Sequence, residues 1–359
     1  MSKTCPAAAP CTGWRSRLIP VIAGVALTAV TAACSSPAAT PAGGGAGTAG
    51  GTAAADSISG KRLIVMVQGS AQADRVVEHH ALELLKKQGV KAELRSNEGA
   101  TNIAIAQLQS GDIDAYSEAV SAGVGGVAAG LPLVDFALAE PRQDYVLLAK
   151  QGINSLADLK GKNIGVQDTT GVNFAQAILA LGKAGLTAKD VSIVATGGQS
   201  VRLPALLAGR VDATMLSHSA EITLKPKGFV TLFDYTKQAP DLYDDNFFAT
   251  RKWLDANGSL AVAINKALLD SFVWFNDTAK VDEVVAEALT IDPKTDKAAL
   301  SSLFDQLRTA DAYPVGTILD KDALATQQDL YVKAGAAKKT VPVDQWVDVS
   351  YAQKAKAQG

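Results

Sequence analysis

Cysteine is scarce in this chain. Among its 359 residues the cysteines are Cys5, Cys11 and Cys34. Because none follows residue 34, the long remainder of the sequence can form no internal disulfide and no cysteine-ligated zinc site. Histidine is as rare, and His79 and His80 are adjacent, whereas two metal ligands on one helix face are three or four residues apart. We therefore expect no metal site and no cofactor.

Aromatic residues and concentrated positive charge are also lacking. Phe, Trp and Tyr make up 6% of the chain, and the formal net charge is −2. No segment gathers Lys and Arg densely, so a nucleic-acid partner is not expected. Trp253, Trp274 and Trp346 fall outside the loops that follow predicted strands, which disfavours a stacking platform for sugars.

The N-terminal region has the pattern of a bacterial export signal. Lys3, Arg15 and Arg17 precede the uncharged segment LIPVIAGVALTAVTAA at 18–33. This segment is shorter than the roughly 20 residues that cross a bilayer, so we predict a signal peptide over 1–33.

Cys34 follows directly, and the sequence TAAC resembles the lipobox of bacterial lipoproteins, although Thr31 stands where a large aliphatic residue is usual. The resemblance implies that Cys34 is lipidated and holds the protein on the outer face of the cell membrane. Simple secretion with a free thiol is the alternative. Residues 34–56 are rich in Gly, Ala and Pro and have no large apolar side chain, so we expect a flexible tether there.

The body of the chain alternates between strand-like and helix-like segments. Strand, helix, strand, helix and strand are predicted in this order over 61–70, 73–89, 90–96, 101–111 and 112–120. The same order returns over 155–167, 173–185, 191–196, 200–209 and 210–216. This alternation predicts an α/β fold with parallel-type sheets.

One short phrase occurs in both halves of that pattern. LQSGDIDAY begins at Leu108, and LLAGRVDATML begins at Leu206. Each Gly is suited to end a helix, and each β-branched residue to begin a buried strand. We interpret Asp114 and Asp212 as acceptors for backbone donors in the turn, with a chemical role as the less favoured alternative. The repeat thus indicates two similar lobes.

Two extended segments, 134–150 and 245–257, lie on either side of the second unit and are interpreted as crossings between the lobes. Helical periodicity after the second crossing predicts helices that cover the first lobe. We therefore assign 57–140 and 241–359 to lobe I, and 141–240 to lobe II.

Several of these segments together resemble the substrate-binding proteins of ABC importers. They are SLADLKGKNIGV at 155–166, the LLAGRVDA phrase, FFATRKWLDAN at 247–257 and the C-terminal helices, and the resemblance extends over about 61–350. The most similar group binds nitrate, alkanesulfonates, taurine or thiamine-precursor pyrimidines.

The resemblance implies a two-lobed periplasmic-binding-protein fold of type II, in which two hinge crossings let the lobes close on a solute. It also implies a non-enzymatic monomer that captures a small polar or anionic organic solute and delivers it to a permease and an ATPase on other chains. An enzyme like the thiamine-pyrimidine synthases, or a ligand-sensing subunit of a membrane receptor, are the alternatives.

Ligands of parallel α/β sheets bind beyond the carboxyl ends of the strands. Hydroxyls, amides and helix N-termini in the loops there favour a small polar or anionic ligand. We expect no catalytic residue, and we predict ligand contacts from Ser70, Gln72, Ser117, Glu118, Arg142, Thr169, Thr170, Asn173, Ser217, His218 and Phe248.

Some of these assignments have alternatives. Thr169 or Thr170 is also suited to cap the following helix. Glu118 would repel an anion and attract an amine if it faces the cleft, and it would have neither effect if it faces solvent. Arg142 is suited to pair with an anionic ligand, whereas Phe248 is as well suited to the core as to a cleft wall.

Overall fold

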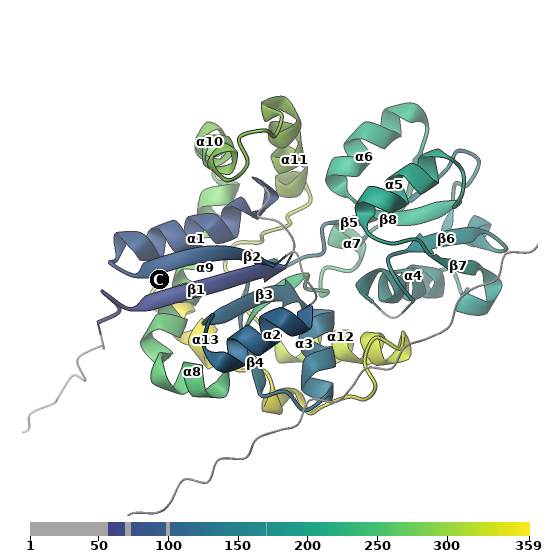
Figure 1. The fold of residues 1–359 in the computed structure, drawn as a ribbon. Coiled ribbons are helices and arrows are strands. Elements are labelled where there is room, and N and C mark those ends of the chain that lie inside the picture. Colours follow the sequence, from purple (N-terminus) through teal and green to yellow (C-terminus); the bar gives the residue numbers. More distant parts are fainter. Residues whose placement is uncertain (1–56, 69–72, 98–100, 170) are drawn as a thin grey trace, which may run out of the picture. The chain divides into compact units, whose positions relative to one another are not determined.

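The computed structural model describes residues 57–68, 73–97, 101–169 and 171–359 (Figure 1). The signal peptide, the tether and the predicted functional residues Cys34, Ser70, Gln72 and Thr170 lie outside the described residues. All described residues belong to one compact unit of the chain.

Two five-stranded sheets form the framework (Figure 1). The first has the strand order β2-β1-β3-β10-β4, and the second has the order β7-β6-β8-β5-β9. The strands of the first sheet are β1 (Arg62–Gln68), β2 (Lys91–Asn97), β3 (Ala115–Ala119), β4 (Leu133–Leu138) and β10 (Asp245–Thr250). Those of the second are β5 (Tyr145–Ala149), β6 (Asn163–Val166), β7 (Ser192–Ala195), β8 (Ala213–Ser217) and β9 (Val230–Asp234).

Both sheets follow one plan. Three strands are parallel, and the next strand, β10 in the first sheet and β5 in the second, is antiparallel to both of its neighbours. The chain passes from the first sheet to the second between β4 and β5, and it returns between β9 and β10. The predicted α/β class with two sheets is confirmed.

Helices cover the faces of both sheets. Their bounds are α1 (Val76–Lys87), α2 (Thr101–Ser110), α3 (Val120–Ala128), α4 (Val172–Lys183), α5 (Gln199–Leu207), α6 (His218–Leu224), α7 (Tyr235–Gln238), α8 (Arg251–Ala256), α9 (Gly258–Asn276), α10 (Val281–Ile291), α11 (Lys297–Thr309), α12 (Lys321–Lys333) and α13 (Ser350–Lys356). Short 3₁₀ helices add η1 (Ala73–Arg75), η2 (Leu156–Leu159), η3 (Ala188–Asp190), η4 (Lys225–Lys227), η5 (Thr278–Lys280) and η6 (Val343–Gln345).

The C-terminal helices were expected to cover the first lobe. Helix α9 packs on α1 through apolar side chains at helical spacing, and α13 packs on α9 and β4. However, α11 also contacts α6, and α12 also contacts α4, so these two helices reach elements of the second sheet as well. Periodicity identifies the apolar face of a helix but not every element that the face meets.

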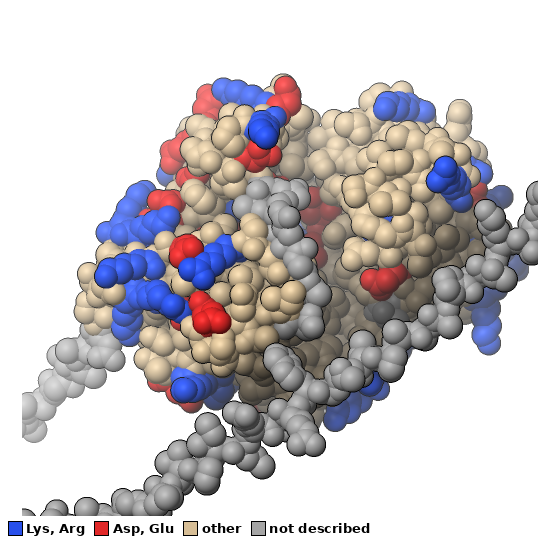
Figure 2. Space-filling view, viewed as in Figure 1, with Lys and Arg blue, Asp and Glu red and all other residues tan. Residues whose placement is uncertain are grey.

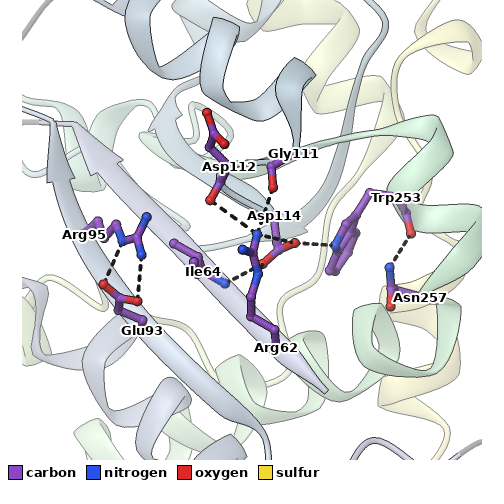
Figure 3. Close-up of polar contacts among 9 residues, drawn as sticks. All are labelled: Arg62, Ile64, Glu93, Arg95, Gly111, Asp112, Asp114, Trp253 and Asn257. Carbon is purple, nitrogen blue, oxygen red and sulfur yellow. Dashed lines mark hydrogen bonds and ion pairs between the residues drawn. The ribbon is translucent and has the colours of Figure 1, made fainter. Parts of the chain in front are cut away.

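Asp114, from the first copy of the repeated phrase, joins the start of β3 to the start of β1 (Figure 3). The backbone N–H of Ile64 donates to Asp114 Oδ2 at 2.7 Å, and Arg62 Nε is 3.2 Å from the same oxygen. The indole N–H of Trp253, from α8, donates to Asp114 Oδ1 at 3.0 Å. The buried carboxylate therefore holds together three segments of the chain.

Asp212, from the second copy, makes the equivalent contact. The backbone N–H of Asn163 donates to Asp212 Oδ2 at 2.7 Å, and Lys150 pairs with the other oxygen. Gly111 and Gly209 both have positive φ, 83° and 69°, at the end of the preceding helix. The interpretation of both aspartates as backbone acceptors is confirmed.

Candidate functional site

A cavity of about 510 Å³ lies between the two sheets. It is reached from the carboxyl ends of β1, β3, β6 and β8 and from both crossings, as the strand-end rule predicts. Its described lining comprises Gln68, Asp74, Arg75, Glu118, Ala119, Ser121, Glu140, Asp144, Tyr145, Gln167, Asp168, Gly171, Val172, Gln199, Ser217, Ser219, Asp244 and Asp245.

Negative charge dominates this lining. In Figure 2 acidic side chains (red) are visible in the hollow between the two halves of the described chain. The acidic lining residues are Asp74, Glu118, Glu140, Asp144, Asp168, Asp244 and Asp245. Arg75 is the one basic residue among the described lining residues.

The guanidinium of Arg75 is surrounded by carboxylates. Its Nη2 lies 2.7 Å from Asp245 Oδ2, and its Nη1 lies 3.2 Å from Glu78 Oε2 and 3.6 Å from Glu140 Oε1. Ser117 donates its hydroxyl to Glu78 at 2.5 Å. The positive charge of Arg75 is therefore neutralised within the protein.

Crowding and burial affect the acids beside Arg75. Burial raises the pKa of Glu140 well above its ordinary value; Arg75 opposes this rise, and Asp245 adds to it. Burial likewise raises the pKa of Asp244, and the neighbouring Asp245 raises it further. These carboxyl groups consequently favour the protonated form more than exposed carboxyl groups do.

His218, the first residue of α6, lies behind the cavity wall. Its Nδ1 pairs with Asp144, and its Nε2 lies 3.3 Å from Asp234 Oδ1. Burial alone would lower the pKa of His218, but the contacts with the carboxylates of Asp144 and Asp234 together raise this pKa to about 10. His218 is therefore connected to the cavity lining through its contact with Asp144.

Two of the predicted ligand contacts, Glu118 and Ser217, belong to the described lining. Glu118 accepts from the Tyr116 hydroxyl at 2.5 Å and from the backbone N–H of Ala119 at 2.9 Å. The side-chain amide of Gln199 donates to Ser217 Oγ at 3.0 Å. The alternative in which Glu118 faces solvent is wrong, since this residue is buried.

The other described candidates are absent from the lining. Arg142 was expected to meet an anionic ligand, but it pairs instead with Asp311 at 3.0 Å and with the backbone carbonyl of Ala310. His218 is engaged by two aspartates, and Ser117 is fully buried against Glu78.

Three further candidates also lie outside the described lining. Thr169 is exposed, and Asn173 is buried in a chain of amides in which its Nδ2 donates to Gln176 Oε1 at 2.8 Å. The ring of Phe248 is buried against Gly123 of α3, in a place that any Cβ at residue 123 would need. The interpretation of Phe248 as a core residue is therefore correct.

Sequence reasoning missed most of the acidic lining. Glu140 and Asp144 lie in the first crossing, Asp245 begins the second, and Asp244 directly precedes it. A usable signal was present in the sequence, because acidic residues are frequent in the first crossing and around the start of the second. The two crossings were identified, but only Arg142 and Phe248 were selected from them.

The adjacent residues His79 and His80 lie outside the cavity and contact other side chains. His79 Nδ1 and His80 Nδ1 each lie 2.8 Å from a carboxylate oxygen of Glu287, and the His80 ring stacks on Trp274. Within the described part of the chain, no cluster of three or more potential ligands is suited to a metal ion. Among the same residues, no helix combines the length and hydropathy needed to cross a bilayer.

Comparison with known proteins gives a family match and a structural match. The family model described as NMT1/THI5 like matches residues 81–277. A Brucella abortus protein, named provisionally as a binding protein, is 30% identical over 151 residues, which are 41% of this chain and 46% of that protein. The match thus spans about half the length of this curated relative.

Solved structures share the fold over most of the chain. The periplasmic aliphatic sulphonate binding protein SsuA of Escherichia coli has a TM-score of 0.66 and 20% identity, over 80% of this chain and 92% of that one. The desulfurization enzyme DSZB has a TM-score of 0.59 and 15% identity, over 83% of this chain and 99% of that one. The fold is therefore that of the two-lobed periplasmic binding proteins, which serves binding proteins and at least one enzyme.

Proposed function

This chain belongs to the NMT1/THI5-like family, and on that premise we propose that it is the solute-binding subunit of an ABC importer. The observation that carries the proposal is the cavity between the two sheets, to which both sheets and both crossings contribute. Its volume of about 510 Å³ suits a small organic molecule. A solute that touches both halves favours their closure, as in other hinged binding proteins.

The proposed role also includes two lobes, a monomeric protein and partner chains in the membrane. Lobe I comprises 57–140 and 241–359, lobe II comprises 141–240, and the protein acts as a monomer. A membrane permease and its ATPase, on other chains, receive the solute. A ligand-sensing subunit of a membrane receptor would use the same cavity, and it would differ in the partner that co-purifies with the closed form.

We further propose that Cys34 carries the lipid anchor and that the protein works on the outer face of the cell membrane. The support is the TAAC sequence after the uncharged segment at 18–33. Replacement of Cys34 by Ser should move the protein from the membrane fraction to the soluble extracytoplasmic fraction. Retention in the membrane fraction would contradict the assignment of the anchor.

The fold is shared with the desulfurization enzyme DSZB, so the residue types of the cavity lining decide whether we propose binding or catalysis. The described lining of the cavity holds neither histidine nor cysteine, the side chains that most often act as base or nucleophile. We therefore propose binding without chemistry. Incubation of the protein with its solute should return the solute with an unchanged mass, and a changed mass would favour an enzyme.

The experiment that tests solute binding is native mass spectrometry of the protein purified without denaturation, followed by thermal unfolding with added solutes. At 100 times its dissociation constant, a true solute adds about 2.7 kcal/mol to the free energy of unfolding. A protein that carries no solute, and that no compound of a broad panel stabilises, would not be a solute receptor.

A further inference from the structure

Building on the proposed solute-binding role, we propose that the solute is an organic cation whose positive group carries N–H bonds, such as an ammonium, amidinium or guanidinium. The acidic cavity between the sheets is its site. This inference departs from the anionic solute that the sequence favoured and concerns the same cavity.

The charge balance of the lining carries the first step. A sulfonate or nitrate in this cavity would meet seven acidic residues, and the one basic residue of the described lining, Arg75, is already in contact with three carboxylates. The repulsion between an anionic solute and these carboxylates is stronger in a partly desolvated cleft than in water. A cation reverses the sign of each of these interactions.

The position of the carboxylates carries the second step. Asp144 lies in the first crossing, Asp244 lies in the return from β9 to β10, and both residues line the cavity. Asp244 is 9% exposed and forms no ion pair with a basic side chain in the described part of the chain. A cation held between these two residues would bind both hinge segments at once.

The neighbours of Asp244 predict how this site responds to protons. Asp245, the next residue and the first of β10, acts on Asp244, as do Arg75 of η1 and Asp144 of the first crossing, where Glu140 also lies. Behind Asp144 stands His218. A bound cation offsets the repulsion among the acids and lowers the raised pKa values of Asp244 and Glu140, so binding releases protons.

The neutral part of the lining narrows the type of cation. Tyr145 is the one aromatic residue of the described lining, whereas quaternary ammonium groups are held by cages of several aromatic rings. Carboxylates instead form short, charge-assisted hydrogen bonds with N–H donors. The cavity therefore suits primary amines, amidines and guanidines better than choline-like groups.

The test is a binding panel on the purified full chain, with agmatine and 1,4-diaminobutane as N–H cations, choline as the quaternary cation, and ethanesulfonate and nitrate as anionic probes. At least one N–H probe should bind at least tenfold more tightly than choline and than every anionic probe. For agmatine, which stays charged, the affinity should be greater at pH 8 than at pH 6.

Asp244→Asn and its matched control, Asp255→Asn, complete the test. Asp255 is an exposed acid of α8 outside the lining. Asp244→Asn should weaken binding of the selected N–H probe at least tenfold, and Asp255→Asn should leave it unchanged. Because the amide replaces a carboxyl group that burial disfavours in its ionised form, the solute-free Asp244→Asn protein should be at least as stable as the wild type at pH 8.

Preferential binding of ethanesulfonate or nitrate would overturn the cation inference and leave the receptor function in place. Choline binding as tight as that of the N–H probes would overturn the requirement for N–H donors. Equal affinities of the two variants would overturn the role of Asp244. A chain that binds no probe and carries no solute in native mass spectrometry would overturn the inference together with the proposed function.

Discussion

Strands β3 and β8 occupy equivalent positions in the two sheets. Each residue of β8 stands 98 positions after its counterpart in β3, since Ala213 begins one strand and Ala115 the other (213 − 115 = 98). At the amino end of both strands, an aspartate accepts the backbone N–H of the neighbouring parallel strand at 2.7 Å. The helix that follows also begins at equivalent positions, Val120 and His218.

The carboxyl ends of the two strands differ. Glu118 of β3 lines the cavity, and its counterpart in β8 is the buried, apolar Leu216. His218 pairs with two aspartates, whereas its counterpart Val120 packs in an apolar cluster. The comparison teaches that the repeat preserves the end that holds the sheet together, while the end that faces the cavity has diverged.

The largest expected effect comes from removal of the first aspartate. Asp114→Ala should lower the free energy of unfolding by about 4 kcal/mol, because it removes the acceptor of the buried N–H of Ile64 and the half-buried N–H of Trp253, and the partner of Arg62. Urea unfolding at neutral pH measures the loss. A loss no greater than that of the equivalent change at Asp212 would contradict the extra role of Trp253.

At the diverged end, His218→Gln should cost about 3 kcal/mol at pH 6, because it leaves Asp144 and Asp234 without their shared cation. The folded pKa of His218, about 10, exceeds its ordinary value of 6.5. The stabilisation is therefore complete below pH 6.5 and is lost as the pH rises towards 10. Thermal unfolding of both proteins from pH 6 to 10.5 should show their difference shrinking, and a constant difference would indicate a packing effect alone.

Asp212→Ala should cost about 2 kcal/mol, less than Asp114→Ala, because it removes one backbone contact and one ion pair with Lys150. Burial alone would raise the pKa of Asp212, but the N–H of Asn163 and the ammonium of Lys150 together lower it. The contribution is therefore present above the unfolded pKa and is lost as the pH falls through the lower folded value. Chemical denaturation at pH 7 and pH 3 tests this, and an unchanged difference at pH 3 would argue against it.

Much of the fold was predictable because its signals are periodic. Apolar spacing located the three parallel strands of each sheet and most helices, and the repeated phrase indicated two similar halves, but β9 was not predicted. Helix α3 escaped prediction because it contains Gly123, Gly125 and Gly126, which have low helix propensity. Packing stabilises it instead, and at Gly123 the absence of a Cβ lets the ring of Phe248 approach the backbone.

The candidate site was less predictable because tertiary partners determine the direction of its side chains. Arg142 and Asp144 are two residues apart in a segment that the sequence predicts to be extended, and an extended chain would place them on the same side. Nevertheless Arg142 turns to Asp311, and Asp144 lines the cavity with His218 behind it. No local pattern in the sequence distinguishes these two outcomes, since both partners lie far along the chain.

The smallest expected effect compares the two glycines that end the preceding helices. Gly111→Ala and Gly209→Ala should each cost about 1 kcal/mol, because Ala disfavours the positive φ of 83° and 69° that these positions adopt. No neighbouring atom would contact the added Cβ at either position, so steric clash adds nothing to the cost. The two losses, measured by urea unfolding, should agree within a few tenths of a kcal/mol. A difference above about 1 kcal/mol would mean that the two copies of the phrase are not equivalent even at the end where their geometry matches, and that the sheets differ in how rigidly they hold this turn.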